Sequence, residues 1–198
     1  QALTLRPIRP EDEAQHRAFL ERLDPEDVRL RVFYSRRSIE HSELARLTQI
    51  DYAREMAFIA TRPIDGPGGE QGEETLGAVR ATVDPDNHTA EFGVIVRSDL
   101  KGSGLGHRLM HKMMGHLRAR GTQRLVGTVL RENSAMLELA RALGFQESAN
   151  PSDPGDHSVR FVSPAGDEAQ PFYFFETIPG ERAQTWQVER PEFDQICL

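Results

Sequence analysis

The chain has 198 residues, of which 38% are hydrophobic and 28% are charged, a balance that favours one compact domain with a buried core over a fibrous or disordered protein. Its formal net charge of −7 argues against binding to nucleic acid, because neutralising phosphates requires a concentrated basic surface. The single cysteine, Cys197, cannot form an internal disulfide, and no apolar stretch reaches membrane-spanning length, so we expect a cytoplasmic protein without a membrane anchor.

The first third of the chain indicates one strand followed by three helices. Apolar residues alternate loosely over Leu3–Ile8, as in a short strand. Over Glu11–Leu23 apolar side chains recur at helical spacing, and Asp24 and Pro25 then supply the N-cap and first-turn proline of a second, short helix. We expect a third helix over Ser42–Leu47.

The middle of the chain indicates three strands. Met56–Thr61 is the first and Thr75–Val83 is the second. The segment between them, Arg62–Glu74, is rich in Gly, Pro and acidic residues, so we expect a mobile loop there. The turn sequence at Asp84–Thr89 then joins the second strand to Ala90–Arg97 as an antiparallel hairpin.

The following part alternates helices and strands. Apolar residues recur every four positions over Leu105–Leu117, and Gly121 ends this helix. Arg124–Leu130 indicates a buried strand, and Asn133 caps a helix that closes at Gly144–Phe145. This order predicts an α+β fold with a central mixed, mostly antiparallel β-sheet flanked by helices.

The last part of the chain gives weaker signals. His157–Val162 and Pro171–Ile178 have the composition of strands, whereas residues 179–198 mix Pro, Gly and charge without a period. We therefore expect residues 163–198 to form a C-terminal extension whose structure the sequence does not define.

A glycine-rich segment precedes the longest predicted helix. Gly102, Gly104 and Gly106 alternate in the stretch DLKGSGLGHRLM, between a strand and a helix. Such a loop leaves several backbone N–H groups pointing into one space at a helix N-terminus, where the helix dipole also favours an anion. The Walker pattern is absent, and His107 occupies the position of the third glycine of the dinucleotide fingerprint. The segment therefore predicts a phosphate site of another kind.

This segment resembles motif A of the GNAT N-acetyltransferases, in which an Arg or Gln, two residues, Gly, one residue and Gly bind the pyrophosphate of acetyl-CoA. Lys101 takes the place of the Arg or Gln, ahead of Gly104 and Gly106. The segment LRENSAMLELARALGF, residues 130–145, resembles the next motif of the family. The resemblance implies a GNAT fold, with residues 1–162 as the acetyltransferase domain and acetyl-CoA as co-substrate.

The resemblance also implies residues for each part of the cofactor. Backbone groups of the strand would pair with the pantetheine arm, the glycine loop would hold the pyrophosphate, and the capping asparagine would lie beside the ligand. In that order these residues are Val94, Ile95 and Val96; Lys101, Gly102, Ser103, Gly104, Gly106 and His107; and Asn133.

The transfer needs a base, because a free lysine amine with a pKa of about 10.4 is almost fully protonated near pH 7. Glu91, thirteen residues before Gly104, resembles the general-base glutamate of protein lysine acetyltransferases. Asp84, Asp86 and Glu55 are the fallback candidates, with turn or surface roles as the alternative. Many family members carry a tyrosine acid seven residues after the motif asparagine, where this chain has an alanine.

Three stretches look most like the acetyltransferase domain of Pat-type bacterial protein lysine acetyltransferases: LRPIRPED, LARLTQIDYAREMAFIA and EFGVIVRSDLKGSGLG. This finer resemblance implies a protein acceptor lysine, on an acyl-CoA synthetase such as acetyl-CoA synthetase, and a start at Gln1 is consistent with a domain excised from a larger synthetase-like protein. Two alternatives stay open, a small-amine acetyltransferase and a non-catalytic acyl-CoA-sensing module.

We expect no metal site in this chain. His107 and His111 lie four residues apart on one predicted helix, but no carboxylate or cysteine stands at a fitting offset. A solvated helix face accounts for this pair. The sequence does not define the oligomeric state or the preferred acyl chain.

Overall fold

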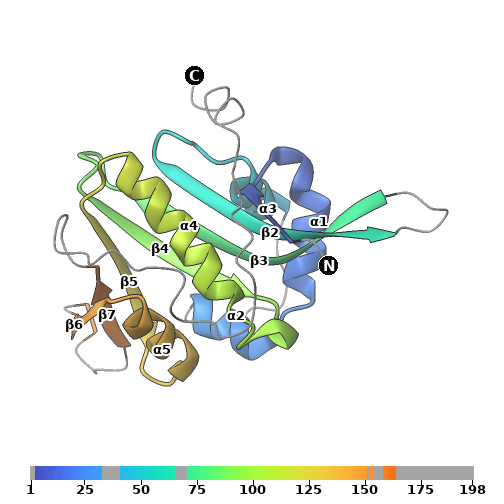
Figure 1. Ribbon diagram of the computed structural model, residues 1–198. Helices are drawn as coiled ribbons and strands as arrows, with labels where there is room; N and C mark the ends of the chain where they lie inside the picture. Colours follow the sequence, from blue (N-terminus) through green and yellow to red (C-terminus); the bar gives the residue numbers. More distant parts are fainter. Residues whose placement is uncertain (1–2, 33–40, 66–70, 151, 154–157, 164–198) are drawn as a thin grey trace, which may run out of the picture.

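The fold is given by a computed structural model that describes residues 3–32, 41–65, 71–150, 152–153 and 158–163 (Figure 1). The predicted strand at 171–178 and residues 164–198 of the C-terminal extension lie outside these residues. No helix in the described part of the chain combines the length and apolar character needed to cross a bilayer.

One seven-stranded sheet organises the described residues, in the order β1-β2-β3-β4-β5-β7-β6. Neighbouring strands are antiparallel except β4 and β5, which run parallel. This confirms the predicted α+β fold with a mixed, mostly antiparallel sheet. The strands are β1 (Thr4–Pro7), β2 (Glu55–Asp65), β3 (Gln71–Val83), β4 (Thr89–Val96), β5 (Arg124–Leu130), β6 (Gln146–Ala149) and β7 (Ser158–Val162).

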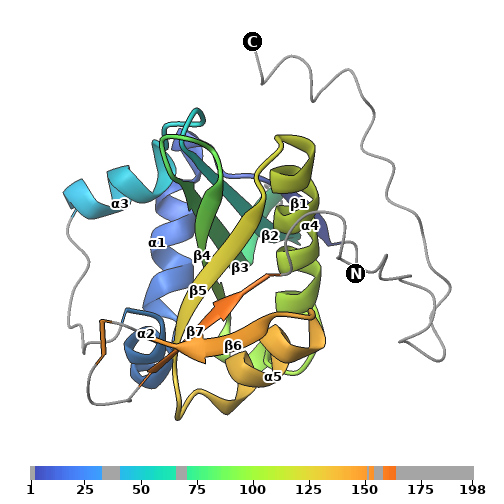
Figure 2. The same cartoon turned by 90° about the vertical axis from the view of Figure 1, so that its left-hand side faces the viewer.

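Helices cover both faces of the sheet. Figure 2 shows α1, α2 and α3 on one side and α4 and α5 on the other. Their bounds are α1 (Glu13–Glu21), α2 (Pro25–Val32), α3 (His41–Thr48), α4 (Leu105–Ala119) and α5 (Ser134–Ala142), with short 3-10 turns η1 (Pro10–Asp12) and η2 (Ser98–Leu100).

The larger core lies between α4 and the sheet. Leu109, Met110 and Met113 are fully buried there. Along β2, Phe58 faces this core, whereas Ile59 faces a smaller cluster on the other side. This is the alternation that a strand buried on both faces requires.

The hairpin of β2 and β3 is longer than predicted. The expected loop over 62–74 is wrong for Arg62–Asp65 and for residues 71–74, which continue the two strands as paired residues. The cause is long-range: the Glu74 carboxylate, 13% exposed, accepts from Arg22 and Arg97 at 3.0 Å each and also pairs with Arg62. Local Gly and Pro content does not encode such cross-strand ion pairs.

One helix boundary and one strand also differ from expectation. The first helix begins as η1, because the buried Asp12 carboxylate accepts the Arg9 backbone N–H at 2.7 Å and the Arg6 guanidinium at 2.7 Å. The short strand β6 was not predicted. Among the described strands it lies outermost and pairs with β7 alone, so little apolar patterning marks it.

Candidate active site

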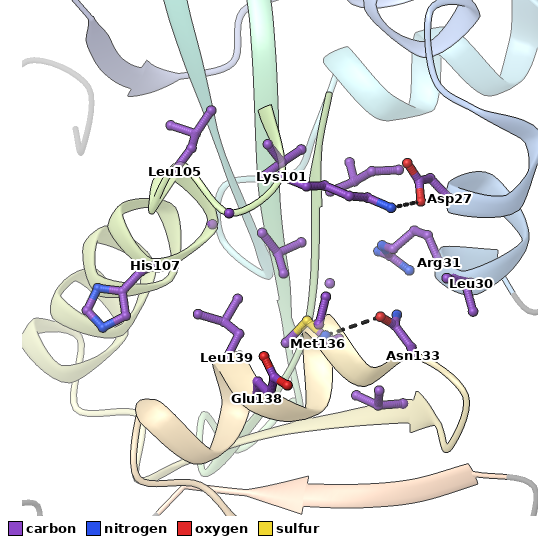
Figure 3. Close-up of a pocket in the computed structure, with 18 of the residues that line it drawn as sticks. Asp27, Leu30, Arg31, Lys101, Leu105, His107, Asn133, Met136, Glu138 and Leu139 are labelled. Carbon is purple, nitrogen blue, oxygen red and sulfur yellow. Dashed lines mark hydrogen bonds and ion pairs between the residues drawn. The ribbon is translucent and has the colours of Figure 1, made fainter. Parts of the chain in front are cut away.

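A cavity of about 450 Å³ opens between α2, β4, β5, the glycine loop and α5 (Figure 3). It brings together most of the residues predicted to hold acetyl-CoA. The predicted residues that line it are Val94, Ile95, Val96, Lys101, Gly102, Gly104, Gly106, His107 and Asn133. Ser103 and Glu91 are the predicted site residues outside this lining.

The cavity forms where the parallel strands separate. β4 pairs with β5 over Thr89–Glu91 only, although β4 continues to Val96 and β5 to Leu130. Within the described part of the chain, β4 therefore has no strand partner on this side over residues 92–96. Its backbone groups there face the cavity and can pair with an extended ligand as a further strand would.

The glycine loop has the backbone of an anion site. Gly102 and Gly104 adopt left-handed φ angles of 74° and 79°, which side chains other than glycine rarely tolerate. Gly104 is the N-cap of α4 and offers no side-chain acceptor, so the first N–H groups of the helix are left for a ligand. Ser103 Oγ instead donates to the Leu100 carbonyl at 2.6 Å.

Lys101 reaches toward α2 rather than along the loop. Its ammonium pairs with the Asp27 carboxylate, as Figure 3 shows. Asp27 is buried and also accepts from Ser98 Oγ at 2.6 Å, while Ser98 Oγ accepts the Asp24 N–H at 3.0 Å. These contacts fasten α2 to the segment that carries the glycines.

Two further predicted residues have structural partners. Asn133 Oδ1 accepts the Met136 N–H at 3.1 Å, which confirms it as the N-cap of α5 and leaves its side chain at the cavity wall. His107 lies on α4, where its ring centroid is 4.5 Å from that of His111. Burial lowers the pKa of His107 below its ordinary value, so the imidazole is neutral near pH 7.

The predicted base, Glu91, is an exposed residue at the last position of β4 that pairs with β5. Since side chains alternate along a strand, Glu91 and Gly93 belong to the same face of the sheet. The fallback carboxylates have other partners: Asp84 accepts the His88 and Thr89 N–H groups of the turn, and Glu55 pairs with Arg80.

Among the cavity residues that sequence reasoning missed are two charged ones from α2, Arg31 and Asp27. Arg31 extends from α2 toward β4 (Figure 3). No spacing rule marks either residue, because the helix lies more than 55 positions away in the chain from the strand it covers. The glycine at position 93, inside a strand, is the one local signal of a close approach.

Comparison with known proteins agrees with this architecture. The family model of the acetyltransferase (GNAT) family matches residues 26–145. An acetyltransferase of Pseudomonas aeruginosa is 30% identical over 149 residues, which are 75% of this chain and 77% of that protein. The L-methionine sulfoximine/L-methionine sulfone acetyltransferase of the same species is 31% identical over 124 residues, covering 58% and 72% of the two chains.

A solved structure extends the likeness to three dimensions. The GNAT domain of S. lividans PAT superposes with a TM-score of 0.68 and covers 80% of this chain and 88% of that domain. At 22% identity this is a likeness of fold.

Proposed function

This chain belongs to the acetyltransferase (GNAT) family and is an acetyl-CoA-dependent N-acetyltransferase, and we propose that it works by direct attack of an acceptor amine in a ternary complex. The observation that supports this proposal is the cavity, in which the open edge of β4 leads from the face of Glu91 to the glycine loop. An extended thioester with a diphosphate at one end fits this arrangement.

We assign the two ends of the cofactor from the backbone. The uncapped N-terminus of α4 and the left-handed glycines suit the diphosphate. The backbone over Val94–Val96 suits the pantetheine arm, which places the acetyl group toward the start of the open edge, near Gly93. The acceptor then approaches from the face of the sheet that Glu91 occupies.

Groups of this chain can assist the first two chemical steps, proton removal and attack on the thioester. Glu91 takes a proton from the acceptor ammonium, directly or through a water, so that the neutral amine can attack the thioester carbonyl. A backbone N–H near Val94 donates to the oxyanion that forms. The attacking nitrogen then releases its second proton to solvent as the C–S bond breaks, and CoA leaves as a thiolate, which needs no acid from the enzyme. This agrees with a buried alanine, Ala140, where many relatives carry a tyrosine.

We consider two classes of acceptor, a protein lysine and a small amine. The protein lysine implied by the Pat-type resemblance stays a prediction, as does the cytoplasmic location. A small amine is supported by the relative that bears the name of a methionine sulfoximine and methionine sulfone acetyltransferase, of which this chain covers 72%.

The test is CoA thiol release by the full chain with purified acetyl-CoA synthetase, lysine peptides and a panel of small amines in parallel. Release that depends on one acceptor, with acetyl recovered on its amine, supports the proposal. Acetyl-CoA binding without release from any acceptor contradicts it and favours the non-catalytic sensing module instead.

The role of Glu91 is tested by Glu91→Gln. We expect kcat to fall about 100-fold or more while the Kd for acetyl-CoA stays unchanged, because the amide keeps the shape but cannot take a proton. The matched control is Asp86→Asn, an exposed carboxylate in the turn before β4, which should keep its activity. Equal kcat values for Glu91→Gln and the unaltered chain would remove Glu91 from the mechanism.

A further inference from the structure

The Arg31 guanidinium lies directly against the backbone of β4 at Gly93. A Cβ atom built at position 93 would overlap the guanidinium atoms of Arg31, so this contact depends on a glycine in the strand. The side chain also lines the cavity, on the wall formed by α2. An arginine is thus held at the centre of the candidate active site.

This guanidinium has no hydrogen-bond or ion-pair partner among the described residues. Burial lowers the pKa of Arg31, and Arg80 lowers it further, while Glu91 acts in the opposite direction. Arg80 has partners of its own in Glu55 and the Leu47 carbonyl. Arginine stays charged in proteins, so the Arg31 guanidinium can donate hydrogen bonds to an anionic group that enters the cavity.

The position of Arg31 sets it apart from the phosphate end of the cofactor. Gly93 comes before the pantetheine-binding stretch of β4, whereas the glycine loop follows its end. Gly93 and Val96 are three positions apart on an extended strand, which is a distance of about 10 Å. Arg31 therefore faces the acetyl end of the cavity, where the acceptor must also bind.

We propose that Arg31 binds the carboxylate of the acceptor, and that the acceptor is an α-amino acid or an analogue with a free carboxylate beside the reacting amine. This inference rests on the proposed acetyltransferase function and names its substrate class. A guanidinium donates two parallel hydrogen bonds to a carboxylate, which fixes both the position and the orientation of the ligand.

Glu91 on β4 and the Arg31 guanidinium against Gly93 place an anion and a cation where a zwitterion can bind. Glu91 and Gly93 lie two residues apart on one face, about 7 Å along the strand. One carbon separates the amine and carboxylate of an α-amino acid, so the amine can lie beside Glu91 while the carboxylate lies beside Arg31. A lysine side chain within a polypeptide offers a cation and no nearby carboxylate, and it would meet an unbalanced positive charge there.

The experiment compares acids with matched neutral acceptors. CoA release by the full chain is measured with the common L-amino acids, with the C-terminal amide and the decarboxylated amine of the best of them, and with a blocked lysine peptide. We expect kcat/KM for the free acid to exceed that for its amide about 30-fold or more. The lower amine pKa of the amide would favour the opposite order, so it cannot produce this result.

Three variants connect the preference to Arg31. Arg31→Met should lower kcat/KM for the acid about 30-fold and leave the amide unchanged. Gly93→Ala should also lower the ratio of kcat/KM for the acid to kcat/KM for the amide, because its methyl group displaces the flexible guanidinium of Arg31. The matched control is Arg29→Met, the same substitution on α2 at a residue that pairs with Glu26 and Glu132 outside the cavity lining. It should keep the full preference.

The outcomes separate this inference from the proposed function. Release with amines or a lysine peptide but without preference for the carboxylate overturns the role of Arg31 and leaves the transferase intact. Equal losses for acid and amide in Arg31→Met also overturn it, since they indicate a purely structural arginine. Binding of acetyl-CoA with no release from any acceptor overturns both.

Discussion

Two glycines with the same backbone conformation lie at opposite ends of α4. Gly104 at the N-terminus and Gly121 beyond the C-terminus both have a φ of 79°, and a Cβ atom at either position would meet no atom within 4 Å. Substitution by alanine should therefore lower the free energy of unfolding through backbone strain alone, by about 1 kcal/mol in each case. They differ in function, because Gly104 lines the cavity and Gly121 does not.

We expect Gly104→Ala and Gly121→Ala to lower the melting temperature equally, by about 2–4 °C. Only Gly104→Ala should weaken CoA binding, about tenfold or more, because its methyl group occupies space beside the backbone donors of the loop. Thermal unfolding and calorimetric titration with CoA measure the two effects. Equal Kd values in the two variants would place the diphosphate elsewhere.

At the scale of single residues, the sequence predicts what local backbone chemistry determines. The Asn133 cap and the end of α4 at Gly121 both follow from short-range rules and are confirmed. Arg31 was missed because its meaning depends on a contact with Gly93, more than 60 positions away. Buried ionic contacts between distant segments leave no periodic signal in either segment.

Among the secondary-structure elements, the β2–β3 hairpin is stabilised by one carboxylate that forms ion pairs with three arginines. Glu74 of β3 pairs with Arg62 of β2, with Arg22 after α1 and with Arg97 after β4. Its neighbour Glu73 is 40% exposed and pairs with Arg6, which also forms an ion pair with Asp12. The two residues are chemically identical but differ in the number of elements they join.

We expect Glu74→Gln to lower the free energy of unfolding by about 1–3 kcal/mol, since three guanidinium groups lose a shared, partly buried carboxylate. Glu73→Gln should cost less than about 1 kcal/mol, because its single exposed ion pair is screened by solvent. Urea titration with a common m-value compares them. If the two losses are equal, the ion pairs of Glu74 do not hold the hairpin.

Across the whole molecule, the sheet consists of two antiparallel parts that meet in a short parallel junction. β1–β4 form one part and β5–β7 the other, and the junction at Thr89–Glu91 is where the strands separate to open the cavity. The order of elements was predictable from turn and helix signals. The point of separation was not, because parallel pairing joins residues brought together by the intervening helix rather than by a turn.

The last described strand of the chain is β7. β7 lies between β5 and β6, and its Phe161 is fully buried in the main core. Directly after it, the Ser163 N–H donates to the Leu125 carbonyl at 2.8 Å, and Leu125 N–H donates to Ser163 Oγ at 2.8 Å. The sheet and core of the described residues are thus complete at position 163, which supports the proposal that residues 1–162 are the acetyltransferase domain.

We therefore expect a chain of residues 1–163 to unfold cooperatively with a melting temperature within about 3 °C of the full chain. A chain of residues 1–153 should not fold, because it loses an inner strand and the burial of Phe161, which alone is worth about 2–3 kcal/mol. Circular dichroism and thermal unfolding distinguish them. A 1–163 chain that folds and binds CoA but loses kcat would assign residues 164–198 to the acceptor site, whereas one that fails to fold would move the domain boundary toward the C-terminus.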